Sequence, residues 1–221
     1  MKSRATLPLA ILAGLAAAGF FVGFWLDIVE LRLATKPVPV LAMAAWVGLN
    51  RPDRVGVAVL VGLLWSVLGD VLLEVPADLF VFGLLAFLVA HLAYIVAAVL
   101  DTRRLAPVRA LPVALYCGAI YLWLMPYMGD LTLPVAVYVT VIALMVWRMA
   151  ARVDGRPWAT LALIGAISFA LSDSVIAIRK FWSDFPGGRE IIMLTYWGGQ
   201  ALIAASVVRS RAGAAPRPDA R

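Results

Sequence analysis

The chain has 221 residues, of which 64% are hydrophobic and only 14% are charged. Soluble domains carry about 25% charged residues, so this chain has too little polar material to cover a surface in water. Lipid removes that requirement because apolar side chains can face outward. The mean hydropathy of +0.95 therefore predicts an integral membrane protein.

Few residues of this chain could bind a metal or act as a strong nucleophile. It has one histidine, His91, and one cysteine, Cys117. A catalytic zinc site needs several imidazole or thiolate ligands, so we expect no metal and no cofactor. The sequence also contains no Gly-x-Ser-x-Gly, Walker A or His-Glu-x-x-His motif.

Eight segments are candidates for crossing a membrane, which takes about 20 mostly apolar residues. In chain order they are Leu7–Leu26, Arg32–Asn50, Val55–Glu74, Leu79–Leu100, Ala110–Gly129, Leu131–Trp147, Pro157–Lys180 and Ile191–Val208. Short loops rich in Pro, Gly, Asp and Arg join them. The sequence therefore predicts an all-α fold, a polytopic transmembrane bundle of eight helices.

The first two segments fit this pattern less well than the others. The first follows Lys2 and Arg4 like a signal peptide, but its apolar run continues to Trp25, which favours a retained helix. The second is the weakest candidate, because Lys36 lies near its start and Pro37 follows directly. The third, fourth and seventh segments each contain a polar residue within an apolar run: Asp70, His91 and Asp173.

The basic residues indicate how the helices are oriented. An even helix count puts both termini on one side, and the loops of that side hold most of the 19 basic residues. The opposite side holds only Arg32, Lys36, Arg179, Lys180 and Arg189. This asymmetry predicts cytoplasmic termini and explains the net charge of +6 without a nucleic-acid partner. We expect one transmembrane domain over residues 1–209, a disordered cytoplasmic tail over residues 210–221, and a bacterial inner (plasma) membrane location.

The polar residues inside the predicted spans gather at one depth, in the half away from the cytoplasm. Ionised groups near the bilayer centre cost about 2.5–3.5 kcal/mol on insertion scales, so such residues usually face the bundle interior and serve a function. The set is Lys36, Asp70, His91, Asp173, Lys180, Tyr196 and Gln200. Residues that merely reach for the membrane surface would scatter over both ends of the helices.

Each of these residues also has a purely structural interpretation. Lys36 and Lys180 could extend to the interface or neutralise Asp70 and Asp173. His91 could bond to a backbone carbonyl, Tyr196 could belong to an interfacial aromatic belt, and Gln200 could join helices. The two aspartates are the hardest to explain in this way. Unequal surroundings can leave one carboxyl protonated and its neighbour ionised, which suits acid–base catalysis through an oxocarbenium-like state.

A set of short motifs in order along the chain resembles the YhhN-like lysoplasmalogenase family of eight-helix membrane proteins. The motifs are Lys36-Pro37, Ser66-x-x-Gly69-Asp70, Phe82-Gly83-Leu84-x-x-Phe87-x-x-Ala90-His91-x-x-Tyr94, Ser172-Asp173-Ser174, Lys180-Phe181, Thr195-Tyr196 and Gln200-x-Leu202-Ile203. The chain departs from the family pattern at Trp197-Gly198-Gly199, where a second aromatic residue and an alanine are expected before the glutamine.

The resemblance implies hydrolysis of the vinyl ether bond of a lysoplasmalogen to a fatty aldehyde and a glycerophospho-head group. Asp70 and Asp173 would be the acid–base pair, without metal or cofactor. Lys36 or Lys180 would hold the lipid phosphate, and His91, Tyr196 and Gln200 would position water or the ether oxygen. The expected partners are a lysophospholipid substrate and the membrane lipid, and the residues predict no particular oligomeric state.

Two other functions are compatible with the same residues. Intramembrane acids also form proton relays, so a proton-coupled transporter is the alternative, although the two halves show no matching pair of broken helices. A non-catalytic lipid-binding protein is the other. Lipid turnover in detergent distinguishes an enzyme from a transporter and from a lipid-binding protein. A transporter needs a sealed vesicle to show its activity, and a lipid-binding protein forms no product.

Reporter fusions test the predicted orientation. A reporter placed after Arg103 and one at the C-terminus should both read cytoplasmic, because both positions lie on the side rich in Arg and Lys. Opposite readings at the two positions would contradict the even number of spans.

Overall fold

A computed structural model describes the backbone of residues 5–214 and the side chains through Arg211. This part of the chain is all-helical and contains no strand. Its α-helices are α1 (Thr6–Trp25), α2 (Val29–Thr35), α3 (Val38–Leu49), α4 (Arg54–Glu74), α5 (Phe80–Asp101), α6 (Ala110–Leu124), α7 (Thr132–Ala151), α8 (Pro157–Phe181) and α9 (Gly188–Ala214). Short 3-10 helices over Pro107–Arg109, Met125–Tyr127 and Gly129–Leu131 flank α6 and α7.

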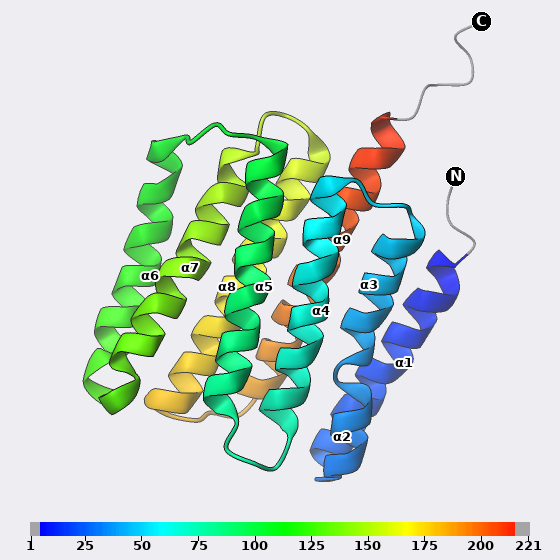
Figure 1. Ribbon diagram of the computed structural model, residues 1–221. Helices are drawn as coiled ribbons and strands as arrows, with labels where there is room; N and C mark the ends of the chain where they lie inside the picture. The colour runs from blue at the N-terminus through cyan, green and yellow to red at the C-terminus, as the bar shows by residue number, and fades with distance from the viewer. Residues whose placement is uncertain (1–4, 215–221) are drawn as a thin grey trace, which may run out of the picture.

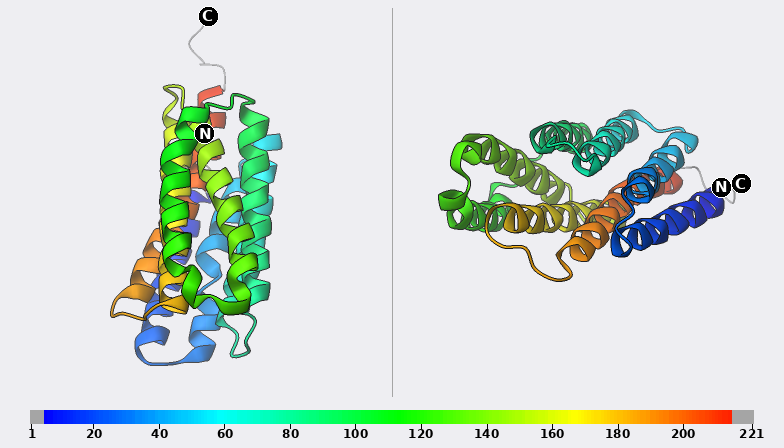
Figure 2. Two further views of the ribbon diagram at one scale, coloured as in Figure 1. Left: turned by 90° about the vertical axis from the view of Figure 1, so that its left-hand side faces the viewer. Right: turned by 90° about the horizontal axis from the view of Figure 1, so that it is seen from below.

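The predicted transmembrane helical bundle is confirmed. Within the described residues, seven helices are long and apolar enough to cross a membrane: α1 and α4 to α9, with the 3-10 turns included. The remaining predicted segment is α2 with α3. Successive segments run up and down, so α1 begins and α9 ends at the same end of the bundle (Figure 1). Viewed along the helix axes, the bundle has an elongated cross-section, with α1 at one extreme and the α6–α7 pair at the other (Figure 2).

The second predicted span is not one continuous helix, which corrects the expectation for residues 32–50. The helix is interrupted at Lys36 and Pro37, between α2 and α3. Pro37 and Pro39 lack the backbone N–H that an uninterrupted helix would use there. The predicted boundary of the tail at Ser210 also differs, because α9 continues to Ala214. The rest of the expected tail, residues 215–221, lies outside the described residues.

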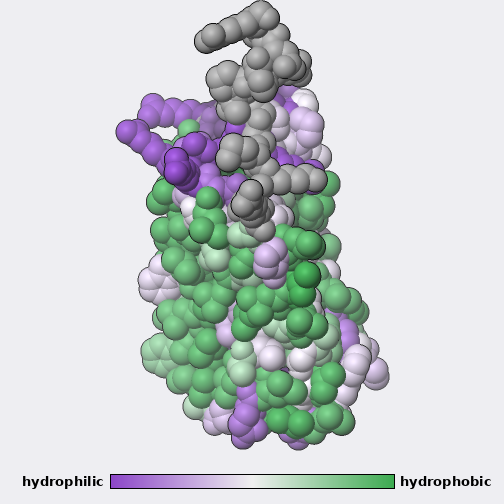
Figure 3. All heavy atoms as spheres, turned by 90° about the vertical axis from the view of Figure 1, so that its right-hand side faces the viewer, coloured by the Kyte–Doolittle hydropathy of each residue, from purple (hydrophilic) through white to green (hydrophobic). Residues whose placement is uncertain are grey.

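Apolar side chains cover the outside of the bundle, as lipid contact allows. Leu7, Leu115 and Leu133 are each at least 65% exposed. The face that carries α1 shows a broad apolar band between two ends where hydrophilic residues gather (Figure 3). Water would penalise such a band, whereas a bilayer solvates it without cost.

Glycines let the central helices approach closely. In α4, a Cβ at Gly69 would lie 2.6 Å from the Phe87 ring, and a Cβ at Gly62 would overlap the Tyr94 ring. The two glycines are seven residues apart along α4, and the two aromatic residues are seven apart along α5. Two rings of α5 therefore fit over two glycines of α4. In lipid, where helices gain little from hydrophobic association, small residues of this kind permit close packing.

The contact between α8 and α9 is closer still, because backbone meets backbone. A Cβ at Gly165 would lie 2.7 Å from the Gly199 carbonyl oxygen, and a Cβ at Gly199 would lie 2.7 Å from the Gly165 carbonyl oxygen. Gly199 belongs to the segment where the sequence departs from its family pattern. The departure at this position therefore has a structural reason.

A glycine-to-alanine pair tests this contact. Gly199→Ala should lower the melting temperature in detergent, with a loss of roughly 1–3 kcal/mol in unfolding free energy, because backbone atoms cannot move aside as a side chain can. Gly198→Ala is the matched control, since a Cβ there meets nothing within 4 Å. Equal melting temperatures for the two variants would contradict the close contact.

Candidate active site

Asp70 lies buried in α4, in the last turns before the end of the bundle opposite both termini. The Tyr196 hydroxyl of α9 donates a hydrogen bond to its Oδ2 at 2.8 Å. No ion pair among the described residues joins Asp70 to Lys36. The structure thus holds this carboxyl with a neutral donor instead of a cation.

Asp173 lies in α8 and is only 13% exposed. The Tyr138 hydroxyl of α7 donates to its Oδ2 at 2.5 Å. His91 Nε2 lies 3.9 Å from the same oxygen, which is too far for a direct hydrogen bond but within reach through a water. The ring of His91 is fully buried, and neither of its nitrogens has a hydrogen-bond partner within the described residues.

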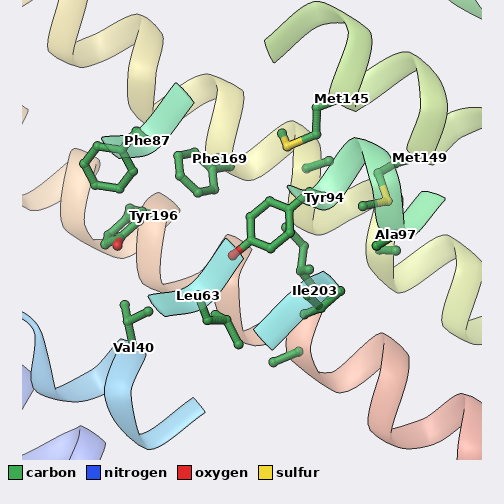
Figure 4. Packing of buried hydrophobic residues seen from close by; sticks show 14 of the residues in the cluster. Val40, Leu63, Phe87, Tyr94, Ala97, Met145, Met149, Phe169, Tyr196 and Ile203 are labelled. Atoms are coloured by element: carbon green, nitrogen blue, oxygen red, sulfur yellow. The ribbon is translucent and has the colours of Figure 1, made fainter. Parts of the chain in front are cut away.

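Aromatic rings fill the space between the two acids. Phe169 packs edge-on against His91, with ring centroids 4.7 Å apart, and against Tyr196 at 5.3 Å. Phe87 contacts both Phe169 and Tyr196 in the same way. The rings of Phe87, Phe169 and Tyr196 come together from three helices (Figure 4). Asp70 therefore contacts this cluster through Tyr196, and Asp173 lies near it beside His91.

In the described part of the chain, Asp173 lies in the wall of a cavity. This cavity, which we call the acid cavity, lies between α4, α5, α6, α7 and α8. Its walls are otherwise largely apolar, and they include Phe87 and Tyr138. An apolar cavity with a single carboxyl in its wall can bind a hydrocarbon and present it to one proton donor or acceptor.

Glu74 forms the charged centre of the same end of the bundle. Its side chain is 4% exposed and accepts from Arg32 Nε at 2.8 Å and from Lys36 Nζ at 3.0 Å. Arg189 Nη1 lies 3.4 Å from its Oε1. Three cations from α2, the α2–α3 break and α9 thus converge on one carboxylate, which leaves a net positive charge.

A second cavity, the cationic cavity, opens beside this cluster. Its charged lining residues are Lys36, Glu74, Arg179, Lys180 and Arg189. It shares three wall residues with the acid cavity: Leu73, Phe80 and Ile176. A site with several cations next to an apolar cavity has the charge pattern that binds an anionic head group on an apolar chain.

Two of these cations are held in place by other contacts. The Lys180 ammonium lies over the Phe80 ring, 4.7 Å from its centroid. Arg179 pairs with Asp184 in the loop after α8, with Nε and Oδ1 2.5 Å apart. Hydrogen bonds from Arg179 lower the pKa of Asp184 to about 2, so this pair stays charged at neutral pH.

Gln200 joins helices, as one of its two interpretations predicted, whereas the two lysines have other partners than the aspartates considered for them. Gln200 uses both ends of its amide to join helices: Nε2 donates to Ser66 at 2.8 Å, and Oε1 accepts from Tyr94 at 2.5 Å. Lys36 pairs with Glu74 instead of Asp70, and Lys180 packs on a ring instead of pairing with Asp173.

Sequence reasoning included Tyr196, the partner of Asp70, but missed two other residues of the site. Tyr138 donates to Asp173, and Glu74 organises the cations, yet neither was a candidate. Glu74 lies at the predicted end of its span, where an exposed acid is unremarkable. Its distance of only four residues from Asp70 was the available signal, since residues four apart share one face of a helix.

Comparison with known proteins identifies relatives along most of the chain. The model of the YhhN family matches residues 31–207. Human lysoplasmalogenase TMEM86A is 39% identical over 160 residues, which cover 69% of this chain and 66% of the relative, just under two thirds of its length. Human lysoplasmalogenase TMEM86B is 34% identical over 177 residues, 79% of this chain and 74% of the relative. A Mycobacterium tuberculosis lysoplasmalogenase is 31% identical over 207 residues, 83% and 77% of the two chains. No solved structure matches.

Removing the charge of Glu74 tests whether it organises the cations. Glu74→Gln should cost roughly 3–5 kcal/mol of unfolding free energy, because it leaves buried cations without their counter-charge. Asp27→Asn is the matched control: Asp27 also pairs with Arg32, at 2.9 Å, but its side chain is 94% exposed, so little change is expected. Melting temperatures in detergent measure both, and an unchanged value for Glu74→Gln would remove Glu74 from this role.

Proposed function

The chain belongs to the YhhN family, and on that premise we propose that it is an intramembrane hydrolase that cleaves the vinyl ether bond of lysoplasmalogens. The observation that carries this proposal is the position of Asp173, in the wall of an apolar cavity that adjoins a cationic one. The names of the relatives support the substrate class. The apolar spans support a multi-pass membrane protein, and we propose the bacterial inner membrane as its location.

The charge pattern of the two cavities supports a single-chain phospholipid as the substrate. The phosphate would lie in the cationic cavity, near Lys36, Lys180 and Arg189. The vinyl ether would then lie in the acid cavity, close to Asp173. The glycerol between them is short, which agrees with two cavities that share wall residues.

The proposed reaction needs only proton transfer and one water. A protonated carboxyl gives its proton to the vinyl carbon that is not bonded to oxygen, which leaves an oxocarbenium ion. Water adds to the oxygen-bonded carbon and loses a proton to a carboxylate. The hemiacetal then breaks its bond to the glycerol oxygen: its hydroxyl proton leaves, the glycerol oxygen takes up a proton, and a fatty aldehyde results.

The surroundings of the two acids support different contributions to this reaction. Asp173 faces the cavity, and a water between its Oδ2 and His91 Nε2 would lie within reach of both. Asp70 accepts a hydrogen bond from Tyr196, whose ring packs against Phe87 in the wall of the acid cavity, so it would contribute from beyond this pair of rings. Gln200 would act as a positioning residue, because it joins α9 to α4 and α5.

Two isosteric variants test the acids directly. Asp70→Asn and Asp173→Asn should each reduce vinyl ether cleavage by about 10²–10⁴, because an amide can neither donate nor accept the proton. Both should stay folded, since neither carboxyl forms an ion pair with a Lys or Arg among the described residues and a neutral amide is easier to bury. Asp130→Asn, in an exposed 3-10 turn, is the control and should keep full activity.

Thermal stability and aldehyde release should be measured on the same purified variants in detergent. Folded but inactive proteins agree with catalysis by these acids. Two variants with normal activity would end the proposal. Lipid movement that occurs only in sealed vesicles, with no aldehyde formed, would favour a carrier instead.

A further inference from the structure

A third hollow extends the acid cavity away from the cationic end. This groove, which we call the α6–α8 groove, is lined mainly by residues of α6, α7 and α8. It shares two wall residues, Cys117 and Ala170, with the acid cavity. The three hollows therefore follow one another, from the cationic cavity past Asp173 into the groove.

The groove offers an apolar surface along α8. Ala170 precedes Asp173 by three residues, and Ile167 and Leu163 continue the wall over the next two turns. From Asp173 to Leu163 this wall is about 15 Å long at 1.5 Å per residue. The one charged residue of the lining, Arg109, is fixed at the far end by hydrogen bonds to the carbonyl oxygens of Ala150 and Val153, at 2.6 and 2.9 Å.

Helix α6 encloses this groove but packs loosely against the rest of the bundle. Only Cys117 and Leu124 of α6 are buried, while Leu111 and Leu115 are more than 60% exposed. The side-chain hydrogen bond between α6 and α8 runs from the Tyr116 hydroxyl to Ser174 Oγ, at 2.9 Å. Tyr116 lines the groove and Ser174 lines the acid cavity, so this bond spans the junction of the two.

We propose that the α6–α8 groove binds the hydrocarbon chain of the lysolipid substrate and that its walls set which chain lengths are accepted. This inference rests on the proposed function. The continuity of the hollows identifies the occupant: cations suit a phosphate, the carboxyl suits the vinyl ether, and an apolar groove directly beyond suits the chain attached to it. The order of the three hollows matches the order of groups along one single-chain lipid.

A second groove lies on the other side of α6, between α6 and α7, and provides a matched control. It shares Cys117 and Val139 with the acid cavity but does not include Ala170 or Ile167. Gly118 lines it, and a Cβ at Gly118 meets nothing within 4 Å. Gly118→Leu therefore fills the α6–α7 groove without touching the proposed chain site.

The experiment measures kcat/KM for vinyl ether lysophospholipids of short, medium and long chain with purified protein in detergent. Ala170→Leu narrows the junction, and Ile167→Trp narrows the groove further from Asp173. Each should lower the ratio of long-chain to short-chain kcat/KM by at least about tenfold, since a poor fit of even one methylene in an apolar pocket costs about this much. The chain length at which activity is lost should be shorter for Ala170→Leu than for Ile167→Trp. Gly118→Leu should keep the wild-type dependence of kcat/KM on chain length.

A binding measurement separates this inference from the proposed reaction. Saturated alkyl ether lysophospholipids cannot undergo the reaction, and their binding raises the melting temperature of the protein by mass action. In Ala170→Leu and Ile167→Trp, the longest alkyl chain that still raises the melting temperature should be shorter than in the wild-type protein. This result is expected even if the wild-type protein cleaves no vinyl ether, in which case only the proposed function fails. Wild-type chain-length profiles in both variants, or a profile shortened only by Gly118→Leu, would overturn the inference. Ile167 is 44% exposed, so its variant keeps the test valid if Ala170→Leu does not fold.

Discussion

The backbone contact between α8 and α9 at Gly165 and Gly199 determines where the polar residues of this protein meet. Helix α8 carries Asp173, and α9 carries Tyr196, the partner of Asp70. Because the two backbones touch, Tyr196, which holds Asp70, and Phe169, which packs on His91 near Asp173, are brought into ring contact. A larger residue at either glycine would separate the helices and with them the acids.

Gln200 depends on the same contact, since it lies one residue beyond Gly199. Its amide joins Ser66 of α4 and Tyr94 of α5, and Tyr94 itself sits over Gly62. Both the oxygen and the nitrogen of this amide are hydrogen-bonded within the bundle. Such pairing is favoured in lipid because an unpaired polar group in hydrocarbon is costly. The interhelical network thus couples the position of α9 to the α4–α5 pair.

The sequence predicted the fold well because hydropathy and charge are properties of single segments. Apolar runs of about 20 residues identify spans, and the depth of Asp70 and Asp173 follows from where the spans end. The interruption at Pro37 was visible only as a weak second span. Partnerships such as Glu74 with Arg189 were not predictable, because they join residues 115 positions apart whose meeting depends on how the helices pack.

The basic residues illustrate the same limit. Arg148 and Arg152 lie at the end of the bundle that carries the termini, and both count toward the charge asymmetry. Both are nevertheless buried at the C-terminal end of α5. Arg148 donates to the Thr102 and Arg104 carbonyl oxygens, and Arg152 donates to Asp101. A charge count treats every arginine alike, whereas the structure distinguishes arginines that hydrogen-bond to a loop from arginines that line a cavity.

Hydrolysis within an apolar bundle also requires a route for water, and the position of the charges indicates where it lies. Asp173 is surrounded mainly by apolar walls, so water cannot reach it favourably through the α6–α8 groove or from the lipid. The cationic cavity is the polar neighbour of the acid cavity, and it lies at the end of the bundle. Its charged residues would favour water there, and Leu73, Phe80 and Ile176 belong to the walls of both cavities. On the proposed function, the cationic end would receive the head group and supply the water, while the chain would lie along the apolar middle of the bundle.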